Sequence, residues 1–262
     1  MKTVVLIGVD GFVGQAFYQL LSLKSSIDLI CINRDNYFEK TGTVSDIVID
    51  LAGSSNKYIA QNKPFDDFQR SAYHCLNVLR DYPSQRHVHI SSVDIYNSID
   101  NQYKTKEDIS IDINDLSNYG FHKKISEEIV QYYSNDWLIF RLAGMVGKGI
   151  KKGPIYDILN GLPIFINPES RFHFLNTLEV AKIIWSIIEL DFSNEIFNVC
   201  GQGNISLKEI SKMAKMELNL AEVNKDSLIR VLNINSTKIQ QYCNIPESKD
   251  AIKKYLSSIN SI

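Results

Sequence analysis

The stretch GVDGFVG, residues 8–14, follows the apolar run Thr3–Ile7 and opens onto AFYQLLSLK. Its three glycines are spaced three apart, between a predicted strand and a predicted helix. In a strand-turn-helix crossover, the first glycine permits the tight turn, the second admits a pyrophosphate, and the third lets helix pack on strand. The helix N-terminus then presents free N–H groups and a positive dipole end to the phosphates. Gly8, Gly11 and Gly14 fit these roles, so the stretch predicts a dinucleotide-binding turn, the alternative being a glycine-rich turn without a ligand.

The rest of the chain alternates short β-rich apolar runs with segments of helical period. Strands buried on both faces are expected at 3–8, 27–33, 46–53, 86–92 and 137–144, and helices at 12–23, 65–81 and 117–134. Farther on, the pattern predicts a helix at 177–190 capped by Asn176 or Thr177, a strand at 195–199, and helices at 206–218 and 248–259. This alternation indicates an α/β fold, a Rossmann-type doubly wound parallel sheet with helices on both faces.

Composition narrows the class of protein. The chain has 262 residues, 44% of them hydrophobic, enough for one sizeable core in one large domain or two interleaved lobes. A net charge of -2 argues against a nucleic-acid partner. The four cysteines are far apart, with no CxxC pair and no histidines at zinc spacing, so no metal site and no disulfide framework is expected.

The N-terminal segment does not have the pattern of a secretion signal. Lys2 precedes a short apolar stretch, but Asp10 and the glycines interrupt it, and no later segment approaches a membrane-spanning length. We therefore expect a soluble cytoplasmic protein that does not associate with a membrane.

The end of the second predicted strand bears on the choice of dinucleotide. An acidic residue there bonds the ribose hydroxyls of NAD, whereas a nearby arginine accommodates the 2′-phosphate of NADP. The strand ends in Asn33, followed by Arg34 and Asp35, which favours NADP(H) over NAD(H). Asp35 weakens the preference because it could pair with Arg34 or face a ribose itself.

Two further segments carry residues suited to chemistry. In HISSVDIYN, residues 89–97, an apolar strand ends in Ser91 and Ser92, at the sheet edge where α/β proteins bind ligands. In NYGFHKK, residues 118–124, Tyr119 and Lys123 are four apart on one helical face. Such a pair is weak evidence alone, and it could be an ordinary surface pair. Its weight comes from its position between the serine strand and the next strand.

Together, GVDGFVG, ISSVDIY, YGFHK, RLAGMVG and ISLKEISKMA resemble an extended short-chain dehydrogenase/reductase of the NAD-dependent epimerase/dehydratase family, over nearly the whole chain. The resemblance implies a catalytic triad of Ser92, Tyr119 and Lys123. The expected cofactor-binding residues are Gly8, Gly11, Phe12, Val13, Gly14, Asn33, Arg34, Leu51, Ala52, Gly53, Ser91, Tyr119 and Lys123. It also implies nucleotide-sugar chemistry and a dimer formed through the helices at 65–81 and 117–134.

The triad has a physical rationale. Hydride transfer to a carbonyl needs a proton donor at the developing alkoxide, and the reverse reaction needs a base there. A tyrosine with an ordinary pKa of about 10 is a poor base at neutral pH. We expect the Lys123 ammonium to lower the pKa of Tyr119 and to hold the nicotinamide ribose, while Ser92 hydrogen-bonds the substrate oxygen.

Several positions depart from the family pattern. Asp94 is where 4,6-dehydratases of the family carry a base, but Val93 precedes it and aspartate is shorter than the usual glutamate, so dehydration is disfavoured. Only eleven residues separate Arg34 from Asp46, too few for the usual helix and third strand, which predicts an open adenine side. Gly144 stands where many family members have an asparagine that contacts the nucleotide-sugar, and Asn97 stands where a glycine is common.

The substrate is expected under the C-terminal part of the chain. We expect a dinucleotide-binding lobe at 1–142, completed by about 177–199, and a substrate-binding lobe at 143–176 and 200–262. Basic residues in that lobe could bind a diphosphate or could simply be solvated. A lone histidine such as His173 is more often structural than catalytic. The expected substrate-binding residues are Asp94, Tyr96, Lys151, Lys152 and Arg171.

Three functions are compatible with these features. The first is an NADP(H)-dependent reductase of a keto-sugar nucleotide, favoured by Arg34 and the open adenine side. The second is an NAD-retaining epimerase with the same triad. The third is a dinucleotide-binding sensor without turnover, against which the intact triad argues.

Overall fold

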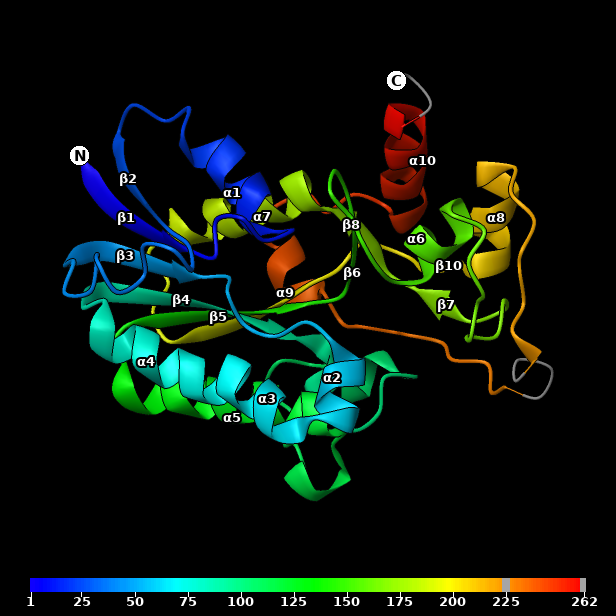
Figure 1. Ribbon diagram of the computed structural model, residues 1–262, viewed down its shortest axis with the longest axis horizontal. Helices are drawn as coiled ribbons and strands as arrows, with labels where there is room; N and C mark the ends of the chain where they lie inside the picture. The colour runs from blue at the N-terminus through cyan, green and yellow to red at the C-terminus, as the bar shows by residue number, and fades with distance from the viewer. Residues whose placement is uncertain (223–226, 260–262) are drawn as a thin grey trace.

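The computed structural model describes residues 1–222 and 227–259 and has a six-stranded parallel sheet at its centre (Figure 1). The strand order is β2-β1-β3-β4-β5-β9, and every neighbouring pair is parallel. The strands are β1 (Lys2–Ile7), β2 (Ile27–Ile32), β3 (Ser45–Asp50), β4 (Ser84–Ser92), β5 (Trp137–Leu142) and β9 (Glu195–Val199). The Rossmann-type α/β fold predicted from the sequence is confirmed.

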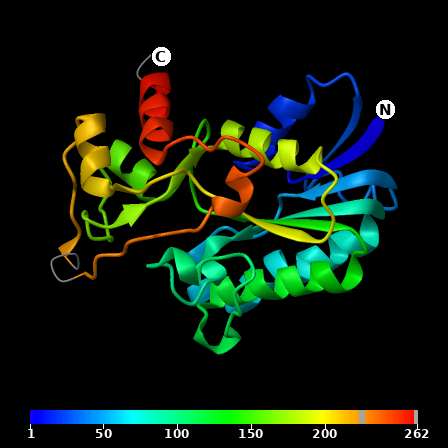
Figure 2. The same ribbon diagram turned by 180° about the vertical axis from the view of Figure 1, so that it is seen from behind.

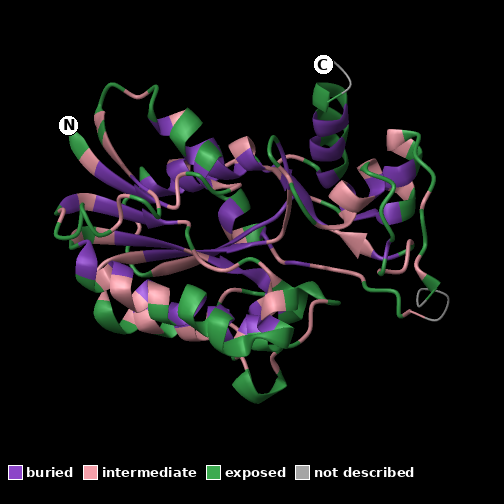
Figure 3. Ribbon diagram, in the orientation of Figure 1, coloured by how far each residue is buried: buried purple, intermediate pink, exposed green. Residues whose placement is uncertain are grey.

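Helices cover both faces of this sheet, as Figures 1 and 2 show from opposite sides. One face carries α1 (Gly14–Leu21) and α7 (Thr177–Ile188), and the other carries α4 (His74–Asp81) and α5 (Asn118–Tyr133). Figure 3 shows buried positions concentrated in the strands and on the inner sides of these helices. The helix expected at 65–81 is three consecutive pieces: α3 (Pro64–Phe68), a π-helical turn (Gln69–Tyr73) and α4.

Local signals set several helix ends. Side-chain oxygens of Ser117 and Asn176 accept backbone N–H groups at the starts of α5 and α7, so Asn176 is the cap of the latter. Ser206 and Glu209 form a capping box on α8 (Leu207–Ala214). This helix ends before the predicted residue 218 because Lys215 adopts the left-handed conformation, with φ 54°.

The burial of β2 differs from the prediction. It was predicted to be buried on both faces, but it is the edge strand of the sheet and most of its residues are partly or fully exposed. The short segment between Arg34 and Asp46 forms turns, and within residues 1–222 and 227–259 no other strand pairs with β2. An edge strand loses the neighbour that would cover its side, so its apolar pattern does not translate into burial.

A second apolar cluster lies beyond the carboxyl ends of the strands, where Figure 1 draws α6, α8 and α10. It joins α6 (Pro154–Leu159), α8 and α10 (Ser248–Ile259). Two small sheets support it: β6 (Gly144–Val146) with β8 (Phe174–Asn176), and β7 (Arg171–Phe172) with β10 (Ile205–Ser206). The remaining elements are α2 (Lys57–Asn62), α9 (Thr237–Gln240) and 3₁₀ turns at Val93–Ile95, Gln102–Lys104 and Ile113–Asp115.

The helices are short relative to a lipid bilayer. In the described ranges 1–222 and 227–259, none is both long and apolar enough to cross a membrane.

Candidate active site

The glycine turn between β1 and α1 has the geometry expected of a phosphate cradle. Gly8 has φ +82°, and the Gly11 N–H donates to the Gly8 carbonyl at 2.9 Å, which closes the turn. A Cβ on Gly14 would lie 2.1 Å from that same carbonyl oxygen, so only glycine allows the helix to start here. Phe12 and Val13, both half-buried, lead into the helix.

The start of α1 suits an anion. Val13 at its N-cap supplies no side-chain hydrogen bond to the first-turn N–H groups. A Cβ on Gly11 would meet only the Gly8 carbonyl, at 3.1 Å, so the turn leaves room beside this residue. An uncapped helix N-terminus beside an open glycine fits a dinucleotide pyrophosphate. The residues present therefore fit the cofactor that the sequence predicts.

The segment after β3 connects this turn to the predicted triad. The Leu51 N–H donates to the Ile7 carbonyl at 3.0 Å, and Ala52 lies against Gly8, 3.0 Å from where a Cβ would be. At the other end, a Cβ on Gly53 would lie 2.8 Å from the Lys123 ammonium nitrogen. Residues 51–53 therefore lie between the glycine turn and Lys123, where cofactor-binding residues were expected.

Asn33 and Arg34, which follow β2, have different surroundings. The Asn33 side-chain oxygen accepts the backbone N–H groups of Asp35 and Asn36 at 3.0 and 3.2 Å, so it shapes the turn. Arg34 is exposed. Its guanidinium is thus accessible at the end of this edge strand.

Ser92 lies at the carboxyl end of β4, between two other predicted site residues. Its hydroxyl donates to Asp94 Oδ2 at 2.9 Å, and it lies near enough to the Tyr119 phenol to affect the pKa of that group. Ser91 is buried beside it, and its Oγ has no hydrogen-bond partner among residues 1–222 and 227–259. Tyr119 itself is 8% exposed. Ser92 and Tyr119 therefore lie near one another.

The helix α5 reaches Ser92 because it packs closely on the turn after β4. A Cβ on Gly120 would lie 2.4 Å from the Asp94 carbonyl oxygen, so this position tolerates only glycine. Ser117 caps the helix through the Gly120 N–H at 3.2 Å. Close packing at Gly120 brings the preceding residue, Tyr119, against Ser92.

Lys123 is one turn farther along α5 and is buried, with 5% exposure. Its ammonium donates to the Ile90 carbonyl at 3.2 Å, two residues before Ser92 on β4. Burial lowers the pKa of Lys123 below the usual lysine value, while Asp50 is the strongest of the anionic groups that oppose this shift. The ammonium therefore lies under the same strand end as the serine and the tyrosine.

The pKa of Tyr119 shifts in the direction opposite to the one expected. Burial and the Asp94 carboxylate raise it above the ordinary phenol value, and the neighbouring Ser92 hydroxyl only partly offsets them. The prediction that Lys123 lowers this pKa is wrong for this structure, where the Lys123 ammonium donates to a backbone carbonyl. Tyr119 is accordingly a protonated phenol at neutral pH, which makes it a proton donor.

One charged residue at this site was missed by the sequence reasoning. Lys57, at the start of α2, donates to Asp94 Oδ1 at 2.6 Å, and its ammonium lies 6.0 Å from the centre of the Tyr119 ring. The available signal was Asn56, which caps α2 through the N–H groups of Tyr58 and Ile59. The short helix was overlooked because its six residues carry too little apolar periodicity.

Some predicted substrate residues have other partners. The Tyr96 hydroxyl is buried between Arg141 and Asn198, at 2.9 and 2.8 Å. Burial raises the pKa of Tyr96 to about 12. The Arg171 guanidinium contacts Glu209 at 2.9 Å and Asn204 at 2.8 Å. The structure therefore does not bring these two side chains together with Ser92 and Tyr119.

The basic loop before α6 is more accessible. Lys151 is exposed, and the Lys152 ammonium donates to the Ser55 carbonyl at 2.6 Å, which links this loop to the segment after β3. His173 is structural, because its Nδ1 lies 2.7 Å from the Gly201 carbonyl and its Nε2 accepts the Ile234 N–H. Lys151 and Lys152 remain candidate ligands of a substrate diphosphate. His173 is not a candidate, because both of its ring nitrogens have backbone partners.

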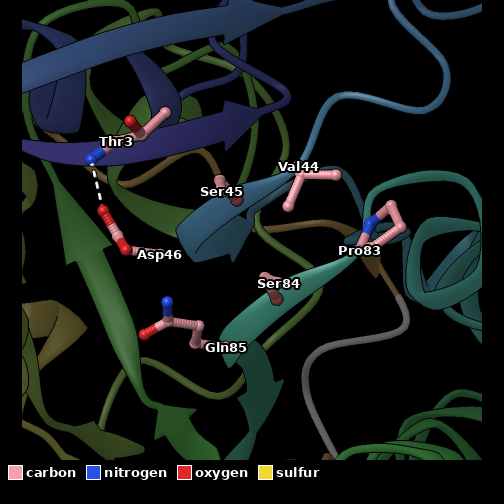
Figure 4. A pocket seen from close by; sticks show the side chains of 7 residues that line it. All are labelled: Thr3, Val44, Ser45, Asp46, Pro83, Ser84 and Gln85. Atoms are coloured by element: carbon pink, nitrogen blue, oxygen red, sulfur yellow. Dashed lines mark hydrogen bonds between the residues drawn. The ribbon is translucent and has the colours of Figure 1, made fainter.

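A surface hollow of about 370 Å³ lies at the other end of the sheet (Figure 4). It is lined by residues at the amino ends of β1, β3 and β4, and Asp46 there accepts the Thr3 N–H at 2.8 Å. Ligands of open α/β sheets bind at the carboxyl ends of strands instead. This hollow is therefore not the candidate active site.

Comparisons with known proteins agree with this architecture. Similar solved structures include a UDP-galactose 4-epimerase (19% identity, 100% of this chain and 99% of that one, TM-score 0.77). A second is the dTDP-4-dehydrorhamnose reductase of Bacillus anthracis in complex with NADP (15%, 98% and 99%, 0.78). A third is the UDP-glucuronic acid 4-epimerase of Bacillus cereus in complex with UDP-glucuronic acid and NAD (16%, 100% and 99%, 0.77).

At these identities the structural likeness establishes the fold, and the family comes from the sequence. No curated protein matches the chain. Residues 4–200 match the family model described as the NAD dependent epimerase/dehydratase family. This match spans most of the chain and includes the glycine turn, Ser92, Tyr119 and Lys123. The chain therefore belongs to the NAD dependent epimerase/dehydratase family, whose members are enzymes that use a nicotinamide dinucleotide.

Proposed function

We propose that this chain is an NADP(H)-dependent reductase that converts a keto group of a nucleotide-linked sugar into a hydroxyl group. The observation that carries the proposal is the buried Tyr119 phenol beside Ser92 at the carboxyl end of β4, with its pKa raised by burial and by Asp94. A reduction begins with the phenol protonated, whereas an oxidation begins with a phenolate. The upward pKa shift of Tyr119 therefore favours the reductive direction.

In this reaction, the bound reduced dinucleotide supplies the hydride to the carbonyl carbon. Tyr119 gives its phenolic proton to the carbonyl oxygen as negative charge develops there, so the product is an alcohol. Ser92 hydrogen-bonds the same oxygen and holds it within reach of Tyr119. The Tyr119 phenolate regains a proton from solvent before the next turnover.

The other predicted residues hold the two substrates. The N-terminus of α1 and Gly8, Gly11 and Gly14 bind the pyrophosphate, while Lys123 binds the nicotinamide ribose and Ser91 lines the cofactor. We assign Asp94 to a sugar hydroxyl and the loop lysines Lys151 and Lys152 to the substrate diphosphate.

The preference for NADP(H) rests on Arg34. Its exposed guanidinium follows the edge strand β2, where a 2′-phosphate would have access to it. The absence of a strand beyond β2 in the described residues leaves the adenine side open. An open side favours exchange of the dinucleotide after each turnover, as a reductase requires.

The proposal divides the chain into two lobes with different ligands. Residues 1–142, completed by 177–199, bind the dinucleotide, and residues 143–176 and 200–262 bind the sugar nucleotide. We propose a cytoplasmic homodimer in which α4 and α5 meet their counterparts across a two-fold axis. Exposed aromatic side chains in these helices and the turn before α4, Tyr73, Tyr132 and Tyr133, support such a contact.

The test is a screen of keto-deoxy sugar nucleotides with NADPH and NADH, followed by the loss of nicotinamide absorbance. Tyr119→Phe should lower kcat by about 10²- to 10⁴-fold while dinucleotide binding is kept, because it removes only the proton donor. Tyr103→Phe, at an exposed tyrosine, is the control. Full turnover by Tyr119→Phe would contradict the mechanism.

The competing function is an epimerase that keeps its NAD. Two of the similar structures are epimerases, and the arrangement of Ser92, Tyr119 and Lys123 serves either activity. Purified protein should distinguish the two, since NAD that survives gel filtration argues for the epimerase. A sensor that binds the dinucleotide without turnover would bind NADPH but reduce none of the sugars.

A further inference from the structure

A group of four metal-ligating side chains is buried behind the candidate active site. Asp50 ends β3, Cys75 lies in α4, and His87 and His89 lie on β4. One donor atom from each residue falls within 4.8 Å of the others, and all four residues are buried. None of the four has a role in the proposed reduction.

The strand order explains why these residues meet. β3 and β4 are parallel neighbours with Asp50 opposite His89, and His87 is two residues from His89 on the same face of β4. Cys75 comes from α4, which covers this face, and its Sγ lies 3.7 Å from the Ser126 carbonyl of α5. Linear spacing could not reveal this group, because its members come from three elements.

Several polar atoms of the group lack a hydrogen bond within the described chain. Asp50 Oδ2 and both ring nitrogens of His87 are buried without a hydrogen bond. Buried polar groups are normally paired, because leaving them unpaired costs free energy. Several unpaired donors and acceptors gathered at one point indicate that another species belongs among them.

Two of the donor-atom distances in the group come near those around a tetrahedral metal ion. His89 Nδ1 lies 3.8 Å from Asp50 Oδ2 and 3.9 Å from Cys75 Sγ. Donor atoms around zinc lie about 3.4 to 3.6 Å apart, given Zn–N, Zn–O and Zn–S bonds of roughly 2.0–2.3 Å in a tetrahedron. These two pairs therefore need to close by only a few tenths of an ångström.

The carboxylate of Asp50 is oriented for such a role. Its Oδ1 is held by His74 Nε2 at 3.2 Å and accepts the Ala52 N–H at 3.1 Å. Its Oδ2 is thereby left facing the group. Metal-binding side chains are typically fixed in this way by a partner on their other polar atom.

We propose that Asp50, Cys75, His87 and His89 bind one Zn²⁺ ion. The donor set of two imidazoles, one thiolate and one carboxylate is one that zinc accepts, and four protein ligands leave no open position, so the site is structural. The thiolate and the carboxylate cancel the charge of the ion, which suits a buried site. On binding, the Cys75 thiol releases its proton to solvent. The ion ties together β3, β4 and α4 behind Lys123.

The test uses the purified full-length chain. Elemental analysis should find one zinc per chain, and the zinc absorption edge should show one sulfur and three nitrogen or oxygen neighbours. Replacement of zinc by Co²⁺ should add a thiolate-to-cobalt charge-transfer band. Cys75→Ser should remove that band and lower zinc affinity by more than about 100-fold. Cys200→Ser should change neither, although its thiol is equally buried.

Three results would overturn the proposal. They are a chain that binds no zinc at micromolar free ion, an absorption edge without a sulfur neighbour, and a Cys75→Ser variant that retains the cobalt band. The absorption edge is measured on the unaltered chain, so the test holds even if Cys75→Ser fails to fold. No step depends on turnover, so the result is independent of the reductase proposal.

Discussion

The Lys57 ammonium lies 2.6 Å from Asp94 Oδ1, while the other oxygen of Asp94 accepts the Ser92 hydroxyl at 2.9 Å. This carboxylate therefore connects a lysine of α2 to the proposed catalytic serine. It also raises the pKa of Tyr119, together with burial. Asp94 is thus placed to tune the proton donor as well as to contact the substrate.

Asp94→Asn should move the alkaline limit of the reductive kcat to lower pH by about one unit. The negative carboxylate disfavours the phenolate, so its removal lowers the pKa of Tyr119, and the protonated donor is lost at a lower pH. A pH-rate profile measures this shift. Asp100→Asn, at an exposed carboxylate paired with Lys104, should leave the profile unchanged. An unmoved alkaline limit in Asp94→Asn would show that Asp94 does not act on Tyr119.

Gly11→Ala should weaken binding of both dinucleotides about ten-fold or more, because overpacking costs roughly 1–3 kcal/mol. The added methyl group meets only the Gly8 carbonyl, at 3.1 Å, and so projects into the space expected for the pyrophosphate. The melting temperature should stay close to that of Gln19→Ala, an exposed control on α1. Unchanged dinucleotide affinity in a folded Gly11→Ala protein would remove the pyrophosphate from this turn.

Arg34→Ala should lower affinity for NADPH by about ten-fold or more and leave NADH binding nearly unchanged, because a hydrogen bond to a charged group contributes about 1.5–3 kcal/mol. Fluorescence titration with each dinucleotide provides the comparison. Lys40→Ala, in the same exposed loop, controls for a general loss of positive charge. If Arg34→Ala lost equal affinity for NADPH and for NADH, Arg34 would have a role other than recognition of the 2′-phosphate.

Glu127→Ala should lower the free energy of unfolding by about 3–5 kcal/mol, because it leaves a buried charge unpaired. Arg141 contacts Glu127 through two hydrogen bonds, at 3.0 and 2.8 Å, and both residues are almost fully buried. Urea denaturation measures the change. Glu128→Ala, which breaks an exposed pair with Lys124 on the same helix, should cost about 0.5 kcal/mol or less. If both variants lost a similar amount of unfolding free energy, burial would not be the reason for the effect of breaking the Glu127–Arg141 pair.

The sequence alone determined the fold and much of the candidate site. The alternation of strand and helix patterns predicted the parallel sheet, and the spacing of Gly8, Gly11 and Gly14 predicted the turn. These signals are local, since each depends on residues within one or two turns of backbone. Ser92 and Tyr119 were assigned from the family resemblance of the segments that contain them, and α5 packs closely at Gly120 on the turn after Ser92.

Only the tertiary structure decided which side chains meet across elements. The Lys57 and Asp94 pair, the partners of Tyr96 and Arg171, and the burial that raises the pKa of Tyr119 all depend on contacts between distant segments. The same holds for the group of Asp50, Cys75, His87 and His89. Sequence periodicity shows which face of an element is buried, but strand order and helix packing determine what each buried polar atom faces.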